Sequence, residues 1–576
     1  MIFKNSQYFF PLVLLFIKST SSLTLPLNYS AFQDTSNDRY MIWKDDFNAN
    51  KLNEWQIVDD LDTEKSNWFV EKGYLIQNTN IGSTKKLIGT NIINGKAEWE
   101  NYAVHTNLVC TDDDYIGILF RYIDNNNYYR FLLSSQQKDI RIEKRVNGNF
   151  TLMANYTEEE WMLTKFSVTI ILKNNNIKAY LNDQQFFDLT DEQFSKGKVG
   201  FVTIGNHGSF FDDIAVYSEY QFKMIDKKPK ITRGPYLQSV LDDKATIMWN
   251  TSIPLNSAVE YGFKPVPTWI KTSDELKNEH EIKLENLGIE TRYFYRIRSG
   301  DLKGEWNLFT TAVKEDSPFS FIVYGDNQMN FLRHEEIVSH ISKHEFDFIV
   351  SCGDVVQRGP RNDWDVEFFS PLKSILKGKP IYAAIGNHEL NADNYYKNFS
   401  NPDDAHENYF SFKYGNSFFI FIDNPRAAYS DKTYYTDCTK GSLQYKWLED
   451  QLASDVAQSA QWLFVVSHIP SYVLGSQEIF PVCKESLVPL FEKYGVDFSF
   501  SGHVHGYERG LVNGVNYIIT AGGGGALNKN RSSLPKQFKN FKIKYNFCHI
   551  KIDAKVVSFK AFDENNEMID QFELTK

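Results

Sequence analysis

The sequence predicts a multidomain α+β protein in which two β-sandwiches precede a C-terminal α/β sandwich. A chain of 576 residues is too long for one hydrophobic core, so roughly two to four domains are expected. Up to residue 313, short runs alternate between apolar and polar positions, as strands with one buried face do. From residue 317 onward, continuous apolar runs alternate with helical stretches, which is typical of a sheet covered on both faces.

The first 22 residues have the layout of a secretory signal peptide. Lys4 precedes an apolar run at 8–17, and a small polar stretch leads to Ser22, where cleavage is expected. The run is shorter than the roughly 20 residues of an ordinary transmembrane helix. We therefore expect a secreted protein, with a lysosomal location or an uncleaved membrane anchor as the alternatives. Asn-x-Ser/Thr acceptors of a secreted glycoprotein occur at Asn28, Asn149, Asn155, Asn250, Asn398 and Asn530.

Residues 40–220 read as short strands separated by Asn, Asp and Gly turns, which predicts the first β-sandwich. The opening DDFNANKLNEWQIVDD and the closing GSFFDDIAVY resemble the two ends of a concanavalin-like (laminin-G-like) jelly roll. The resemblance implies a domain that binds a carbohydrate or another cell-surface ligand. Its aromatic side chains either stack on sugars or pack within the sheets, and the sequence leaves both readings open.

A second, smaller β-sandwich is expected at residues 229–313, after the lysine-rich joint MIDKKPKIT. Its short alternating strands and its length suit a fibronectin type III-like domain. Arg233 opens the stretch RGPYLQ, which resembles the start of the N-terminal domain of purple acid phosphatases.

Residues 317–576 form the predicted α/β domain, with helices expected at 331–342, 364–376 and 442–456. Each apolar strand of this domain ends in a polar cluster, and α/β sheets assemble their sites at the carboxyl ends of strands. In chain order these clusters are Asp326 with Gln328, Asp354, Asn387 with His388, His468, and His503 with His505.

These clusters offer the donors of a two-metal hydrolytic site. A single aspartate after a strand is usually a turn residue or a helix cap, but that reading does not explain five clusters in succession. Carboxylate, amide oxygen and imidazole suit hard to borderline divalent ions, and one bridging carboxylate would hold two ions about 3.5–4 Å apart. The order GD, GD, GNHE, H and GHVH resembles the calcineurin-like metallophosphoesterase superfamily, and GHVHGYER with RGPYLQ resembles its purple acid phosphatase-like branch.

The resemblance implies two divalent or mixed-valence ions of the Fe/Zn/Mn class and a mechanism that depends on them. Such ions lower the pKa of a water molecule towards about 7, and the hydroxide attacks phosphorus in line. His388 matches the catalytic histidine of the GNHE element, which stabilises or protonates the leaving oxygen. The implied ligands are Asp326, Asp354 and His505 for the first ion and Asp354, Asn387, His468 and His503 for the second.

Three residues depart from the family pattern or extend it. Gln357 stands where purple acid phosphatases have the tyrosine that binds ferric iron and gives the colour, so we expect a colourless enzyme. Gln328 stands where many superfamily members have a histidine ligand; its side-chain oxygen either completes the first metal site or hydrogen-bonds nearby. Arg358 in GDVVQRG resembles the arginine of the serine/threonine phosphatase element GDxxDRG, which implies substrate binding. The alternative is a surface arginine before a Gly-Pro turn.

Three further features carry expectations. Glu389, next to His388, either orients its loop or is a solvated carboxylate. The run GGGG at 522–525 is not a phosphate loop, because no Lys-Ser/Thr and no helix follow it. We expect it to let the backbone pass close to the metal site. Cys438 and Cys483 could pair as a disulfide in an oxidising compartment.

The leading hypothesis is a secreted binuclear phosphatase that hydrolyses phosphate monoesters, with acid phosphatase activity. A phosphodiesterase or nucleotide pyrophosphatase is the alternative within the enzymes, because the same core performs both reactions. A surface binding protein with a vestigial phosphoesterase domain is the alternative outside them, since the two sandwiches occupy a large part of the chain. The net charge of −11 argues against nucleic acid as a partner.

Overall fold

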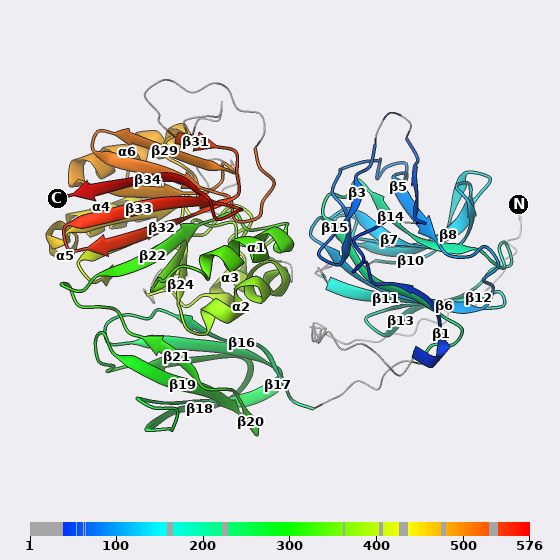
Figure 1. The fold of residues 1–576 in the computed structure, drawn as a ribbon, viewed down its shortest axis with the longest axis horizontal. Helices are drawn as coiled ribbons and strands as arrows, with labels where there is room; N and C mark the ends of the chain where they lie inside the picture. The colour runs from blue at the N-terminus through cyan, green and yellow to red at the C-terminus, as the bar shows by residue number, and fades with distance from the viewer. Residues whose placement is uncertain are drawn as a thin grey trace, which may run out of the picture. The chain divides into compact units, whose positions relative to one another are not determined.

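The computed structural model describes residues 38–52, 54–61, 63, 65–157, 165–221, 228–360, 363–402, 407–425, 436–473, 480–528 and 540–576. The predicted signal peptide at 1–22 and the acceptors Asn28 and Asn530 lie outside the described residues. The described chain is mostly β-structure with a few helices and forms several sheets, so the multidomain prediction is confirmed (Figure 1). Among the described residues, no helix combines the length and the apolar character that crossing a bilayer requires.

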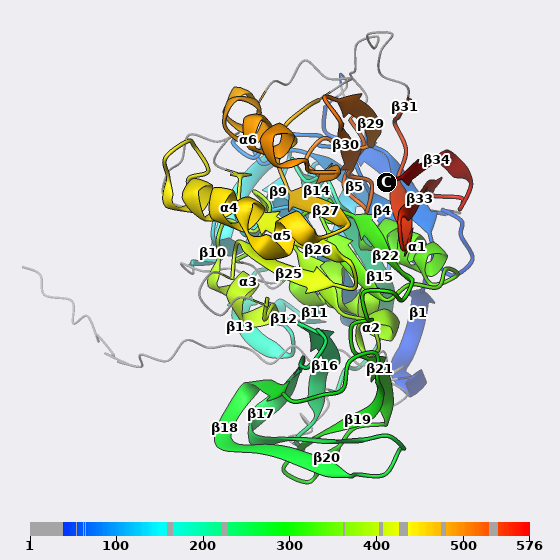
Figure 2. The same ribbon diagram turned by 90° about the vertical axis from the view of Figure 1, so that its left-hand side faces the viewer.

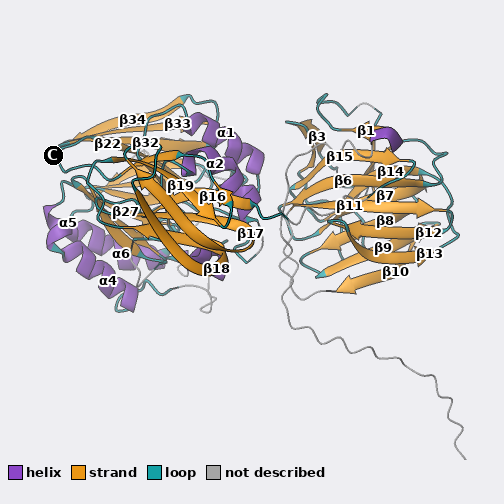
Figure 3. Ribbon diagram, turned by 90° about the horizontal axis from the view of Figure 1, so that it is seen from below, coloured by secondary structure: helices purple, strands orange, loops and turns teal. Residues whose placement is uncertain are grey.

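The first domain is a β-sandwich, as predicted (Figure 3). Phe201 and Phe211 come from different sheets and meet in its core with ring centroids 4.3 Å apart. A short 3-10 turn at Asp38–Tyr40 precedes the first strand. One sheet has the order β13 (Gln184–Thr190), β12 (Asn176–Leu181), β11 (Lys165–Lys173), β6 (Tyr102–Cys110), β15 (Ser209–Tyr217), β4 (Tyr74–Gln77) and β3 (Trp68–Glu71), with β1 (Met41–Asp45) beside β15. The other has the order β10 (Asn149–Thr157), β9 (Asp139–Val146), β8 (Asn127–Ser134), β7 (Tyr115–Asp124), β14 (Lys198–Ile204), β5 (Thr90–Asn94) and β2 (Gln56–Asp59).

The second domain is built on two long strands, β17 (Ala245–Gly262) and β18 (Trp269–Leu284). The sequence pattern suggested separate short strands here; instead β17 continues through register shifts between Asn250 and Ser257. All strands of this domain join one hydrogen-bonded sheet, so the fibronectin type III assignment stays a prediction. Its order is β16 (Ile231–Gln238), β17, β19 (Arg292–Ser299) and β20 (Leu302–Lys303), with β18 beside β17 and β21 (Asn307–Thr310) beside β19.

The third domain contains two mixed sheets that pack face to face. Phe321 and Phe464 come from different sheets, and their rings meet edge to face at 5.4 Å in the shared core. One sheet, here called the first sheet, has the order β24 (Ile381–Ala383), β23 (Phe348–Ser351), β22 (Phe319–Tyr324), β32 (Asn546–Asp553), β33 (Val556–Asp563) and β34 (Met568–Thr575). The second sheet has the order β25 (Phe410–Tyr414), β26 (Ser417–Ile422), β27 (Trp462–Ser467), β28 (Phe498–Ser501), β30 (Val515–Thr520), β29 (Tyr507–Val512) and β31 (Asn540–Lys542).

Helices cover the outer face of each sheet, so the domain is the predicted α/β sandwich (Figure 2). On the first sheet, Ile337 of α1 and Leu372 of α2 pack in one cluster with Ile349. On the second sheet, Leu448 of α4 and Leu487 of α6 pack in one cluster with strand residues such as Val465. The described helices are α1 (Phe331–Ile341), α2 (Ser370–Leu376), α3 (Asp393–Asn398), α4 (Leu443–Ala453), α5 (Asp455–Ser459) and α6 (Pro481–Tyr494).

Two predicted helices are interrupted. The helix expected at 364–376 begins with a π-helical segment, η2 (Asp365–Phe369), before α2. The helix expected at 442–456 ends at Ala453, because the next residue, Ser454, is extended and caps α5 by accepting the backbone N–H of Ala457.

The structure contradicts the predicted disulfide and one of the predicted glycan acceptors. Cys438 and Cys483 are buried free thiols instead of a disulfide; a hydrogen bond to Cys438 and burial raise the pKa of the Cys483 thiol. Asn149 and Asn155 are exposed, as glycan acceptors must be. Asn398 is buried and accepts a hydrogen bond from Arg233 at 2.5 Å, so a glycan at Asn398 is incompatible with the fold.

Candidate metal centre

The polar clusters that follow the strands of the third domain meet at one edge. β22, β23 and β24 are parallel to one another, and so are β26, β27, β28 and β30, so the carboxyl ends within each set lie together. The first sheet supplies Asp326, Asp354 and Asn387, and the second sheet supplies His468, His503 and His505.

The group predicted to bind the second ion is compact, and all of its members except the half-buried His503 are buried. Nε2 of His468 lies 3.0 Å from Oδ2 of Asp354 and 2.9 Å from Oδ1 of Asn387. Nδ1 of His503 lies 3.0 Å from the same Asn387 oxygen. The ligand atoms of Asp354, His468 and His503 all lie within 4.8 Å of one another. Four donors converging in this way fit a divalent cation.

The group predicted to bind the first ion centres on Asp326. Nε2 of His505 lies 3.3 Å from Oδ1 of Asp326, which also accepts the backbone N–H of His503 at 2.8 Å. Oδ2 of Asp326 is buried, and it has no hydrogen-bond partner among the described residues. The N–H of Asp326 donates to the carbonyl of Gly353 at 2.9 Å, so the loops that carry the two aspartates touch.

Backbone carbonyls outside the donor groups orient two of the imidazoles. Nδ1 of His468 lies 2.9 Å from the carbonyl of Cys352, and Nδ1 of His505 lies 2.7 Å from that of Ala526. A carbonyl can only accept, so each Nδ1 carries the proton and each Nε2 turns towards its carboxylate. This arrangement is common around metal-binding histidines.

Burial and neighbouring charges shift the pKa values of three members of the group. Burial raises the pKa of Asp354, but the imidazoles of His468 and His388 outweigh it and lower that pKa below its usual range. Burial lowers the pKa of His468, yet the Asp354 carboxylate raises it to about 9. Burial, reinforced by His468, lowers the pKa of His503 to about 3. A cation would therefore compete with the proton that His468 shares with Asp354.

The backbone around the donors is strained and crowded. Asp326, Asp354 and His503 have positive φ angles of 58°, 52° and 67°, in the left-handed region that is uncommon for non-glycine residues. A Cβ on Gly525 would come within 2.5 Å of the His505 ring, so the predicted close passage of the 522–525 backbone is confirmed.

His388 lies beside the donor groups. Its Nδ1 is 2.8 Å from the Gln357 carbonyl, its Nε2 is 3.9 Å from Oδ2 of Asp354, and its side chain is 32% exposed. The Gln357 carbonyl thus holds the ring through Nδ1, while the side chain stays partly exposed. Arg358 lies in the same loop as Gln357, and its guanidinium pairs with Asp113 between β6 and β7.

Glu389 is fully buried, so the reading as a solvated carboxylate is wrong. Its carboxylate accepts backbone N–H groups of Gly386 at 2.6 Å, Asp354 at 3.0 Å and Val355 at 2.8 Å. It therefore joins the loop after β23 to the loop after β24 and fixes the distance between Asp354 and Asn387.

Replacing Glu389 by glutamine is expected to lower the free energy of unfolding of the metal-free protein by about 1–3 kcal/mol. The glutamine NH₂ group would face backbone N–H donors and leave part of them without an acceptor. Denaturant unfolding measures the change, with the exposed Glu345→Gln as the matched control. Equal midpoints for the two variants would contradict the role of Glu389.

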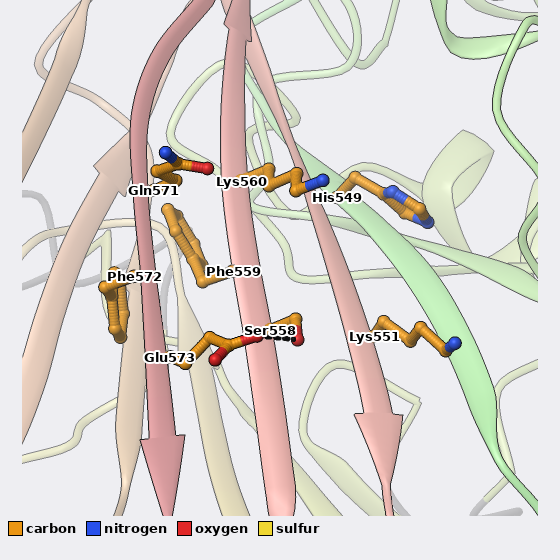
Figure 4. Close-up of a pocket in the computed structure, with 8 residues that line it drawn as sticks. All are labelled: His549, Lys551, Ser558, Phe559, Lys560, Gln571, Phe572 and Glu573. Atoms are coloured by element: carbon orange, nitrogen blue, oxygen red, sulfur yellow. Dashed lines mark hydrogen bonds between the residues drawn. The ribbon is translucent and has the colours of Figure 1, made fainter.

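A separate pocket lies on β32, β33 and β34 (Figure 4). It is lined by Phe559 and Phe572 and by polar side chains that include Lys551, Lys560 and His549. None of the predicted metal ligands lines it, so we assign it no part in the chemistry.

Two family models match the chain. Residues 319–507 match the calcineurin-like phosphoesterase model, and residues 42–226 match the 3-keto-alpha-glucoside-1,2-lyase-like domain. Purple acid phosphatase 5 of Arabidopsis thaliana is 26% identical over 308 residues, which cover 48% of this chain and 70% of the relative. Phosphoenolpyruvate phosphatase of Allium cepa is 26% identical over 331 residues, covering 51% of this chain and 64% of the relative. Probable inactive purple acid phosphatase 24 of Arabidopsis thaliana is 24% identical over 360 residues, covering 52% of this chain and 57% of the relative.

A solved structure shares the fold. The purple acid phosphatase PPD1 from yellow lupin (Lupinus luteus) seeds superimposes with a TM-score of 0.54 and 15% identity, covering 90% of this chain and 95% of that chain. Together with the polar clusters at the strand ends, the comparisons confirm the predicted class of hydrolase. The chain is a metallophosphoesterase, in which a calcineurin-like phosphoesterase domain with purple acid phosphatase relatives follows an N-terminal concanavalin-like β-sandwich.

Proposed function

We propose that this chain is a secreted binuclear phosphatase that hydrolyses phosphate monoesters. The observation that carries the proposal is the position of Asp354 between two donor groups. On one side it faces His468, and on the other its loop touches that of Asp326. The layout of residues 1–22 supports secretion.

The side chains fit two ions of the Fe/Zn/Mn class. Asp326 and His505 would hold the first, Asn387, His468 and His503 the second, and Asp354 both. Such ions, when bound, activate water and neutralise the charge of a phosphoryl group. A buried carboxylate oxygen of Asp326 without a partner among the described residues supports this fit, because such an oxygen is costly to bury alone.

The chain's own residues complete the chemistry. His388 is held through Nδ1 by the Gln357 carbonyl, so its Nε2 is free to face the leaving oxygen. There it would donate a proton or a hydrogen bond as the ester bond breaks. Arg358 would reach substrate phosphate only after leaving Asp113.

Metal content and substrate choice test the proposal together. We expect purified, reconstituted full-length chain to bind two metal equivalents and to hydrolyse p-nitrophenyl phosphate with a higher kcat/KM than bis-p-nitrophenyl phosphate. A preference for the diester would instead identify a phosphodiesterase or nucleotide pyrophosphatase. Binding of less than one metal equivalent would favour a binding protein with a vestigial phosphoesterase domain. One relative is itself described as a probable inactive purple acid phosphatase.

The N-terminal sandwich extends the proposal. Its match to a lyase-like domain named for a glucoside supports a carbohydrate or cell-surface ligand for residues 42–226. In this arrangement the sandwich would bring the phosphatase to its substrates.

A further inference from the structure

The side-chain amide of Gln328 is buried and unsatisfied among the described residues. The side chain is 0% exposed, and neither Oε1 nor Nε2 has a hydrogen-bond partner among the described residues. Burying an amide without hydrogen bonds costs roughly 1–3 kcal/mol by the evidence of protein mutants. A fully buried amide in this state, two residues from Asp326, indicates a ligand that the side chain is built to meet.

Gln357 presents a second oxygen of the same kind. Its Oε1 is buried and has no hydrogen-bond partner in the described part of the chain. Gln357 follows Asp354 by three residues, as Gln328 follows Asp326 by two. Each predicted carboxylate ligand of the first ion is thus followed by a glutamine whose amide oxygen has no hydrogen-bond partner within the described ranges.

The carboxylate of Glu367 brings the two glutamines together. One of its oxygens accepts the backbone N–H of Met329 at 3.0 Å, and the other accepts that of Gln357 at 2.5 Å. Nδ2 of Asn327 donates to the carbonyl of Val355 at 2.7 Å. The segments 327–329 and 355–357 therefore run side by side over one fully buried carboxylate from η2.

We propose that the amide oxygens of Gln328 and Gln357 complete the first metal site and that Glu367 positions them. The inference rests on the proposed two-metal function and specifies the chemistry of one ion. With two carboxylates, two neutral amide oxygens and one imidazole, this site is richer in oxygen than the second. Oxygen donors suit hard divalent ions such as Mn²⁺ and Mg²⁺, and the site lacks the phenolate that would stabilise ferric iron.

Titration of the metal-free full-length chain with Mn²⁺ tests the inference. Wild-type protein is expected to bind two equivalents. Gln328→Ala and Gln357→Ala should each weaken one equivalent at least about tenfold and leave the other, held by Asn387, His468 and His503, unchanged. Glu367→Gln should weaken the same equivalent through misplacement of both loops. Gln571→Ala, an exposed glutamine on β34, is the control.

A conservative change protects the test against misfolding. Gln328→Glu keeps the oxygen and adds a negative charge, so it should bind the first equivalent more tightly, which a damaged fold cannot do. Electron paramagnetic resonance should show coupled Mn²⁺ pairs in wild type and isolated ions in Gln328→Ala. Unchanged affinities and spectra in both alanine variants would overturn the inference and leave the phosphatase proposal standing. Wild-type protein that binds fewer than two equivalents would overturn both.

Discussion

Replacing Asp354 by asparagine is expected to lower turnover by at least about 10³-fold and to reduce bound metal to one equivalent or less. Asparagine has the same shape but no charge, so it cannot bridge two cations. The same change should lower the pKa of His468, because the Asp354 carboxylate is the charge that raises it. Metal analysis and steady-state hydrolysis of p-nitrophenyl phosphate measure the two effects.

Asp347→Asn is the matched control for this change. Asp347 precedes the same strand, β23, and its carboxylate accepts the backbone N–H of Ser320 at 3.0 Å. Asp354 follows the strand at its other end. The control should keep both metal equivalents and nearly full turnover. If the Asp354 variant did the same, a bridging role would be excluded.

Replacing His388 by alanine is expected to lower kcat about 10²–10⁴-fold without loss of metal. Metal content should be unaffected because His388 lies farther from Asp354 than the predicted ligand His468 does. Nε2 of His388 is 3.9 Å from Oδ2 of Asp354, whereas Nε2 of His468 is 3.0 Å from it. The loss should be greatest for esters with poor leaving groups, because these depend most on a proton donor. Comparing phenyl phosphate with p-nitrophenyl phosphate tests that dependence.

His549→Ala, in the separate pocket on β32, β33 and β34, provides the control (Figure 4). It should leave kcat and metal content unchanged. A His388 variant with normal turnover would remove this histidine from the mechanism. A variant that lost one metal equivalent would make His388 a ligand instead of an acid.

The sequence was a good guide wherever function depends on what directly follows a strand. Asp326, Asp354 and His468 each come after an apolar run, and parallel strands bring such positions to one edge without any further information. It was a poor guide to groups whose role depends on partners distant in the chain. Glu389 lay open to two readings and Glu367 gave no signal, because each acts through backbone N–H groups of another loop.

The predicted bounds of one helix and one strand also differ from the structure. The predicted helix 442–456 carries a continuous helical pattern, and only the conformation of Ser454 interrupts it. Short strands were predicted at 229–313, whereas β17 is 18 residues long although the turn-forming residues Asn250 and Pro254 lie inside it. Pairing with β18 keeps it extended, so neighbours in space outweighed local preference.

The division of the donors between two sheets has a mechanical consequence. Asp326, Asp354 and Asn387 follow strands of the first sheet, whereas His468, His503 and His505 follow strands of the second. Cations held by both sets would act as cross-links between the two sheets of the sandwich, which share no strand pairing among the described residues. Ions that bind only the folded chain stabilise it by mass action. Chelation of the ions would thus lower the stability of the domain and abolish hydrolysis together.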